Sequence, residues 1–230
     1  MANLFNPELL YRCPGLNAQR MKENYQVKNI EEITLKEFAS LSSGKKPVVT
    51  GGTLIISCAS LASTLILMSL QLSRAKIRKI EIKELLSENL RELESLKSQL
   101  ANQAGQDLQL FDSFRSLKVK VKSAERDELL WKATESPLRA AELMQRILSL
   151  TFGTLNYCKK NLLSDFGAGV EILYASFKSI LLIAQGNINS LPEDQQVDFQ
   201  QQKNKLGFEG EKLASSLISL LNKNQSKIKT

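Results

Sequence analysis

The chain of 230 residues contains no histidine, which limits the chemistry that its side chains can perform. Without histidine there is no Ser-His-Asp triad, no Cys-His pair and none of the usual zinc sites, so we expect no metal. Acid-base catalysis would depend on Asp, Glu, Lys, Tyr or Cys with an adjusted pKa. Cys13, Cys58 and Cys158 lie far apart and match no ligand or redox spacing, so we expect reduced thiols in a cytoplasmic protein.

Gly51, Gly52 and Thr53 form the most distinctive short motif. They stand where an apolar helix is expected to open, so free backbone amides and the positive end of the helix dipole would meet there. Such a start can bind anions or polarised oxygens. Glycines required for tight packing would explain the same residues equally well.

The motif opens the stretch from Pro47 to Ser73, which has no charged residue. Its length would span a bilayer, because about 20 apolar residues suffice. Many of its side chains are small or hydroxylated, however, and suit a helix that other helices approach from several sides. We therefore expect the buried centre of a helical bundle, and a membrane span is the less favoured alternative.

Apolar periodicity predicts helices along the rest of the chain. Thr34 and Glu37 form a capping box for a short helix. An amphipathic helix follows from Ile82 to Leu100 and can continue through Gly105 to Leu117, whereas residues 118–122 alternate like a strand but are interpreted as a loop.

Four further helices are predicted towards the C-terminus. A short helix covers 123–134, and Ser136-Pro137 marks a new helix start. Ser164-Asp165 caps the next helix, which ends at a turn over 186–189, and a last helix begins near Pro192. The sequence thus predicts an all-α, multihelical bundle around one central apolar helix. We expect an irregular extension at 1–32, a helical domain at 33–224 and a polar tail at 225–230.

The net charge of +7 is compatible with nucleic acid, an anionic membrane surface or an anionic small molecule. The basic runs 118–122 and 223–229 lack interleaved aromatic residues that would stack on bases, so a solvated basic surface is preferred and no nucleic-acid partner is expected. Residues 1–32 show no secretory pattern.

Several strings, taken in order, resemble the cyclodeaminase/cyclohydrolase family, which includes formiminotetrahydrofolate cyclodeaminase and methenyltetrahydrofolate cyclohydrolase. The likeness covers about 33–221. It is carried by these strings: ITLKEFASLSSG followed by TGGT; QDLQLFDSFRSLK, which resembles the family's Asp-x-x-x-Phe segment ending in a basic residue, here Lys118; ERDELLWKATESPL; NLLSDFGAG; and INSL.

This resemblance implies a homodimer that acts on a one-carbon unit carried by tetrahydrofolate, with no membrane partner. It places acid-base groups at Asp107 and Asp165. Substrate contacts are implied at the positions that match the family's glycine turn, Asn-x-x-Ser-Asp string and basic residue: Gly51, Gly52, Thr53, Asn161, Ser164 and Lys118. If the two aspartates share a cleft, burial and repulsion would raise one pKa and let that carboxyl donate a proton.

Departures from the family pattern leave a second function open. The family's turn is typically Pro-Gly-Gly-Gly-Ser, and here Val49 and Thr50 precede Gly51-Gly52-Thr53. Gln185 stands where the family usually has Asn. A helical dimer with a degenerate folate site, used for interaction rather than catalysis, is therefore the alternative to the enzyme.

Overall fold

The computed structural model describes residues 33–43, 47–116 and 124–226, and within them every regular element is helical. The helices are α1 (Leu35–Ser43), α2 (Gly51–Arg74), α3 (Ile80–Ser116), α4 (Ala124–Thr154), α5 (Leu163–Ile188) and α6 (Glu193–Ser226), with short 3-10 turns η2 (Leu155–Tyr157) and η3 (Lys160–Leu162) between α4 and α5. The all-helical prediction is confirmed. The predicted extension at 1–32 and the predicted loop at 118–122 lie outside the described residues.

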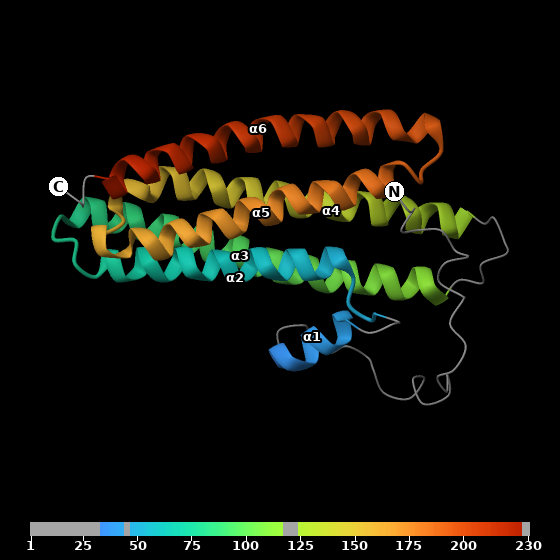
Figure 1. The fold of residues 1–230 in the computed structure, drawn as a ribbon, viewed down its shortest axis with the longest axis horizontal. Coiled ribbons are helices and arrows are strands. Elements are labelled where there is room, and N and C mark those ends of the chain that lie inside the picture. Colours follow the sequence, from blue (N-terminus) through green and yellow to red (C-terminus); the bar gives the residue numbers. More distant parts are fainter. Residues whose placement is uncertain (1–32, 44–46, 117–123, 227–230) are drawn as a thin grey trace.

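Five long helices lie side by side along one axis, and α1 stands apart from them (Figure 1). Helix α2 packs mainly against α3 and α5, while α4 contacts α3, α5 and α6. The core is a single cluster of mostly aliphatic side chains, with Phe166 and Phe177 of α5 as its largest fully buried members. The bundle therefore positions the two ends of α2 far apart, at opposite ends of α5.

The central helix is α2, which begins at Gly51 and ends at Arg74. Its inner side is fully buried at Ile56 and Ile66. The expectation that neighbours surround it is correct for that side only, because Leu61 is 60% exposed and Leu72 51% exposed. By length and composition, α2 and the stretch from Lys160 to Ile188 could each cross a membrane, and half of each apolar window is buried inside the bundle.

Two glycines let α5 approach its neighbours closely. A Cβ atom on Gly169 of α5 would lie 2.8 Å from Cγ1 of Ile66 and 3.0 Å from the carbonyl oxygen of Ala62, both on α2. A Cβ atom on Gly210 of α6 would lie 2.3 Å from the Phe177 ring. Gly210 is thus a packing contact between α6 and α5.

Two predictions for the N-terminal half of the chain are confirmed: the capping box of α1 and the length of α3. The capping box is confirmed, since the Glu37 amide donates to Thr34 Oγ1 at 3.2 Å and the Thr34 amide donates to Glu37 Oε2 at 3.0 Å. The backbone bond from Thr34 lowers the pKa of Glu37, and the Thr34 hydroxyl adds to the effect. The amphipathic helix also continues through Gly105 as predicted, because α3 ends only at Ser116.

The predicted helix start at Ser136-Pro137 is wrong, because α4 is continuous from Ala124 to Thr154 and Pro137 lies inside it. Proline lacks the amide that would bond to the carbonyl of Ala133, four residues earlier. The buried side chain of Asn187 supplies the missing donor, with Nδ2 lying 2.7 Å from the Ala133 oxygen. A bond between α4 and α5 thus replaces one within α4.

The boundaries of the last two helices also move. Helix α5 begins at Leu163, and the capping position, Leu162, makes no side-chain cap bond, so Ser164 is not the predicted cap. Asp165 lies in the first turn as expected. The predicted turn at 186–189 is wrong, because α5 continues to Ile188, and α6 extends to Ser226, inside the predicted polar tail.

Candidate functional site

Asp107 of α3 lies against the N-terminal end of α2, where two threonine hydroxyls hold its carboxylate. The Thr50 hydroxyl donates to Asp107 Oδ2 at 2.6 Å, and the Thr53 hydroxyl donates to the same oxygen at 2.8 Å. Thr50 is also the N-cap of α2, since its Oγ1 accepts the Thr53 amide at 2.9 Å. The positive end of the α2 dipole favours the negative carboxylate at this position.

Gly52 is required by the close approach of Asp107. A Cβ atom at this position would lie 2.9 Å from Oδ2 and 3.2 Å from Oδ1 of Asp107, whereas at Gly51 the nearest atom, Cδ1 of Ile183, would be 3.8 Å away. Of the two explanations for the glycine pair, close packing therefore accounts for Gly52. A carboxylate of the chain itself occupies the helix start that could have received an external anion.

Helix α4 completes the surroundings of Asp107 through Ser136. The Ser136 hydroxyl lies 3.3 Å from Asp107 Oδ1 and accepts a bond from Gln103 Nε2 at 3.0 Å. Gln103 and Asp107 lie four residues apart on one face of α3, so both point towards α4. Oδ2 thus has two short hydroxyl donors, while Oδ1 has one longer contact, with Ser136.

A groove of about 590 Å³ runs between α3 and α4 beside this network. Gln103 and Ser136 belong to its lining, which also includes Gln106, Gln109, Leu110, Ser113, Leu129, Trp131, Lys132, Glu135 and Arg139. The indole of Trp131 is held edge-on by Phe199, with ring centroids 5.5 Å apart. Lys132 pairs with Glu128 and Arg139 with Glu135. The groove therefore combines an aromatic ring, amides, hydroxyls and charges of both signs next to Asp107.

The second group of sequence-predicted residues lies at the other end of α2. The Lys159 amide donates to Ser73 Oγ at 3.0 Å, so the segment that carries Asn161, Ser164 and Asp165 packs at the C-terminal end of α2. All three of these residues are exposed. Since 20 residues of helix separate Thr53 from Ser73, the two groups are about 30 Å apart.

Asp107 and Asp165 therefore do not share a cleft within one chain, and the expected mutual repulsion between them does not operate there. The structure brings Asp107 together with Gly52 and Thr53 and leaves Asn161, Ser164 and Asp165 at a distance. Lys118 lies outside the described residues. Among these residues the structure shows no group of three or more acidic or cysteine side chains that could hold a metal ion.

Comparisons with known proteins identify the family. The family model described as formiminotransferase-cyclodeaminase matches residues 34–205, which is most of the chain. The chain belongs to this family. Its fold is similar to the crystal structure of formiminotetrahydrofolate cyclodeaminase from Thermotoga maritima, with a TM-score of 0.76 and 18% sequence identity over 87% of this chain and 100% of that one. No curated protein sequence matches the chain.

Within this formiminotransferase-cyclodeaminase domain, the sequence did not lead us to Gln103 and Ser136 as site residues, and Thr50 was noted only as a departure from the family's glycine turn. Gln103 could have been identified from the sequence, because a residue four positions before Asp107 lies on the same face of the helix. Ser136 was interpreted as a cap, and its side chain points to Asp107 instead. The Thr50 hydroxyl donates to Asp107, so the residue that departs from the family's glycine turn makes a hydrogen bond to the candidate acid-base group.

Two other features lie away from Asp107. Burial raises the pKa of Cys158 to about 11; a bond from Ser73 lowers this pKa and the charge of Asp165 raises it.

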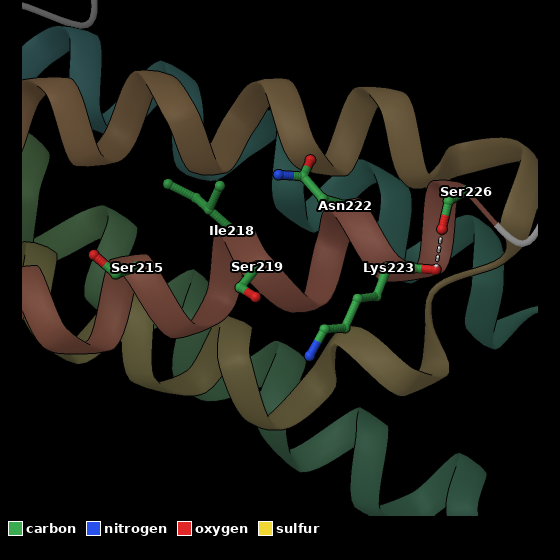
Figure 2. Close-up of a pocket in the computed structure, with 6 residues that line it drawn as sticks. All are labelled: Ser215, Ile218, Ser219, Asn222, Lys223 and Ser226. Carbon is green, nitrogen blue, oxygen red and sulfur yellow. Dashed lines mark hydrogen bonds between the residues drawn. The ribbon is translucent and has the colours of Figure 1, made fainter.

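A second hollow follows the C-terminal part of α6, where Ile218 and Asn222 project to one side and Ser219 and Lys223 to the other (Figure 2). Residues of a single helix line this hollow, so it offers no convergent set of polar groups.

Proposed function

We propose that this chain is an enzyme of folate one-carbon metabolism, of the formiminotetrahydrofolate cyclodeaminase or methenyltetrahydrofolate cyclohydrolase type, with Asp107 as its acid-base group. The observation that carries the proposal is the Asp107 carboxylate, which is fixed through Oδ2 by two hydroxyls, while Oδ1 lies 3.3 Å from Ser136, a residue that lines the groove. Family membership supports the substrate class.

Cyclodeamination requires one proton to move between two nitrogen atoms of the substrate. A second folate nitrogen adds to the formimino carbon and loses its proton, and ammonia leaves that carbon after gaining one. A single carboxylate can accept the first proton and deliver it to the leaving nitrogen. Cyclohydrolysis makes a similar demand, with water as the group that adds. Oδ1 of Asp107 suits this task because Oδ2 is already held by Thr50 and Thr53.

The groove between α3 and α4 is our candidate for the site of the folate rings. Trp131 offers an aromatic edge, and Gln103 and Ser136 offer amide and hydroxyl groups next to Asp107. Lys132 and Arg139 supply positive charge for the acidic tail of the substrate. Gly51, Gly52 and Thr53 act here by shaping the start of α2. We propose no metal and no cofactor other than the tetrahydrofolate derivative.

We further propose that the protein acts in the cytoplasm as a homodimer, without a nucleic-acid or membrane partner. Cys58 and Cys158 are unpaired, which suits a reducing compartment. The exposed apolar side of α2 suits a protein partner.

The direct test uses the absorbance of methenyltetrahydrofolate. Purified protein is added to this compound to follow cyclohydrolysis, and to formiminotetrahydrofolate to follow its appearance by cyclodeamination. A titration of the same folates by calorimetry measures binding. Turnover of either substrate supports the enzyme, and the faster reaction identifies the type. The absence of both binding and turnover would overturn the proposal.

One observation favours a non-catalytic interaction protein of the same fold. Thr50, Thr53 and Gly52 enclose Asp107 so closely that the start of α2 is filled by the chain itself. If folates neither bind nor react while the protein is dimeric, this alternative accounts for the retained scaffold.

A further inference from the structure

The Ser136 hydroxyl of α4 lies between two side chains of α3. The amide nitrogen of Gln103 lies 3.0 Å from the hydroxyl oxygen, and Asp107 Oδ1 lies 3.3 Å from the same oxygen. Ser136 is 3% exposed and Gln103 is 8% exposed, so both groups are largely withdrawn from water. A polar group that loses its partner in such a place is not compensated by solvent, so each of these contacts constrains the other.

The direction of the hydrogen bonds follows from the atoms involved. The Ser136 carbonyl oxygen, which can only accept, lies 3.4 Å from one atom of the Gln103 amide, so that atom is the nitrogen. An amide nitrogen only donates, and the Ser136 hydroxyl oxygen therefore accepts from it. The hydroxyl proton is left for Asp107 Oδ1. The donors thus run in one direction, from Gln103 through Ser136 to Asp107.

The Ser136 hydroxyl differs in its partner from many other serine hydroxyls in the helices of this protein. Ser63 and Ser69 of α2 each donate to the carbonyl four residues earlier, which is a common arrangement for serine inside a helix. Ser136 donates instead to a carboxylate on a neighbouring helix. Its hydroxyl is therefore directed by contacts with α3 rather than by the backbone of its own helix.

Hydroxyl groups from two helices contact both oxygens of the Asp107 carboxylate. Thr50 and Thr53 at the start of α2 donate to Oδ2, and Ser136 of α4 donates to Oδ1. Among the ion pairs found in the described residues, none includes Asp107. Because the terminal torsion of an aspartate is soft, these hydroxyls determine how the plane of the carboxylate is turned. Ser136 makes the longest of the three contacts, and Gln103 directs it.

We propose that Gln103 is a positioning residue for Asp107, acting through Ser136: its amide turns the Ser136 proton towards Oδ1 and so fixes the plane of the carboxylate. The effect on turnover rests on the proposed function, whereas the orientation of the carboxylate does not. A small misplacement of a reacting group can lower a rate by about 10²-fold. A side chain that never touches the reacting atoms can therefore control turnover.

Direct contact between Gln103 and a bound folate is the competing explanation, because Gln103 also lines the groove. The two roles differ in their kinetics. Loss of a residue that only binds the substrate raises KM and leaves kcat unchanged. Loss of a residue that orients the acid-base group lowers kcat and leaves KM nearly unchanged.

The kinetic test replaces the Gln103 amide. Gln103→Met keeps the length of the side chain and removes the donor, and should lower kcat by about 10- to 100-fold with KM changed less than about twofold. Gln103→Asn, whose amide is one methylene shorter, should behave in the same way. Gln99→Met is the matched control, because Gln99 donates to Ser95 Oγ at 3.3 Å on the exposed side of α3 and should be dispensable. A raised KM with unchanged kcat would overturn the proposal.

The role of Ser136 as the intermediate is tested by a double substitution. Ser136→Ala should lower kcat by a factor similar to that of Gln103→Met. If Gln103 acts through Ser136, adding Gln103→Met to Ser136→Ala should lower kcat no further. Losses that multiply in the double variant would show that Gln103 acts independently of Ser136, and would overturn the proposal. Circular dichroism checks that all three variants keep the helical fold.

Nuclear magnetic resonance tests the orientation without any turnover. In protein labelled with carbon-13 at the aspartate side-chain carboxyl, the Asp107 signal is identified by its absence from Asp107→Asn. At one fixed pH this signal should shift in Gln103→Met and in Ser136→Ala, and should stay in place in Gln99→Met. An Asp107 signal that does not move in Gln103→Met overturns the proposal, whether or not the protein is active. Wild-type protein that neither binds nor converts the folates, but shows the expected shifts, would refute the proposed function and leave the positioning of Asp107 by Gln103 in place.

Discussion

Thr50 donates its hydroxyl to Asp107 across a sequence separation of 57 residues, at 2.6 Å. The same oxygen atom of Thr50 caps α2 by accepting the Thr53 amide. One side chain thus sets both the start of the central helix and the orientation of the Asp107 carboxylate, which contacts Ser136 in the lining of the groove. Substitutions around this pair separate catalysis from stability.

Replacing Asp107 by Asn should reduce turnover by about 10²- to 10⁴-fold, because a positioned acid-base group contributes that much. The amide has nearly the same shape, so circular dichroism should be unchanged. Asp112→Asn, on the exposed side of the same helix, is the matched control and should retain activity. Asp165→Asn is expected to lose turnover as well, and unchanged activity in both Asp107→Asn and Asp165→Asn would refute their catalytic assignment.

A methyl group at Gly52 should displace Asp107. The added Cβ atom would lie 2.9 Å from Oδ2, so the carboxylate or the start of α2 must move, at a cost of about 1–3 kcal/mol. We expect Gly52→Ala to lower both turnover and the midpoint of chemical unfolding. Gly51→Ala, where the nearest atom is 3.8 Å from the added carbon, should leave both nearly unchanged. Equal effects of the two variants would contradict this account of the glycine pair.

Thr50→Val removes a hydroxyl while keeping the shape of the side chain. Loss of the cap should cost about 0.5–2 kcal/mol in the free energy of unfolding, measured by urea titration. Turnover should fall further than stability explains, because Asp107 loses its shortest hydroxyl donor. Thr50→Ser restores the donor and should rescue both quantities. A Ser variant that behaves like Val would show that the hydroxyl is not responsible.

Asn187 and Pro137 should be energetically coupled. Asn187→Ala leaves the buried Ala133 carbonyl without its donor and should cost about 1–3 kcal/mol. Pro137→Ala restores a backbone amide four residues after Ala133, so the same asparagine substitution should cost less in that background. A double-mutant cycle of unfolding free energies measures the difference. Strict additivity would mean that the two positions do not share the carbonyl.

Cys158 should react slowly with iodoacetamide. Its pKa is raised to about 11 by burial, so the thiolate is scarce at a pH of about 8.5, where an unfolded cysteine is partly ionised. In a Cys13→Ser, Cys58→Ser variant, labelling should be much slower in the native than in the urea-unfolded protein. Because the folded pKa lies above the unfolded one, this thiol should also make stability fall as pH rises from about 9 to 11. Rapid native labelling would contradict the burial of this thiol.

The sequence was sufficient where local patterns decide structure. The capping box at Thr34, the long α3 and the apolar α2 followed from residue spacing. Pro137 and Asn187 misled the prediction for a shared reason, since each breaks a helix locally and the bond from Asn187 to Ala133 compensates across two helices. The contact between Asp107 and Gly52 also depends on how α2 and α3 pack, which no short segment encodes.

The structure brings the predicted residues together at only one end of α2, and Gln103 and Ser136 beside them were not predicted. Asp107, Gly52 and Thr53 were identified together because the resemblance covers each of their strings. Their separation from Asp165 could not be predicted from spacing in the sequence. It depends on α5 lying antiparallel to α2, which places Asp165 at the C-terminal end of α2, 20 residues away from Thr53.

The glycine contacts of α5 have a consequence for motion. The backbone of α5 at Gly169 meets Ala62 and Ile66 of α2, and the Phe177 ring of α5 meets the backbone of α6 at Gly210, so α5 is in close contact with both neighbours. Sliding α5 by one turn would drive bulky groups into Ile66 and Gly210. The register of the bundle is therefore locked, and no internal rearrangement of the helices can shorten the span between Asp107 and Asp165; only another molecule can bridge it.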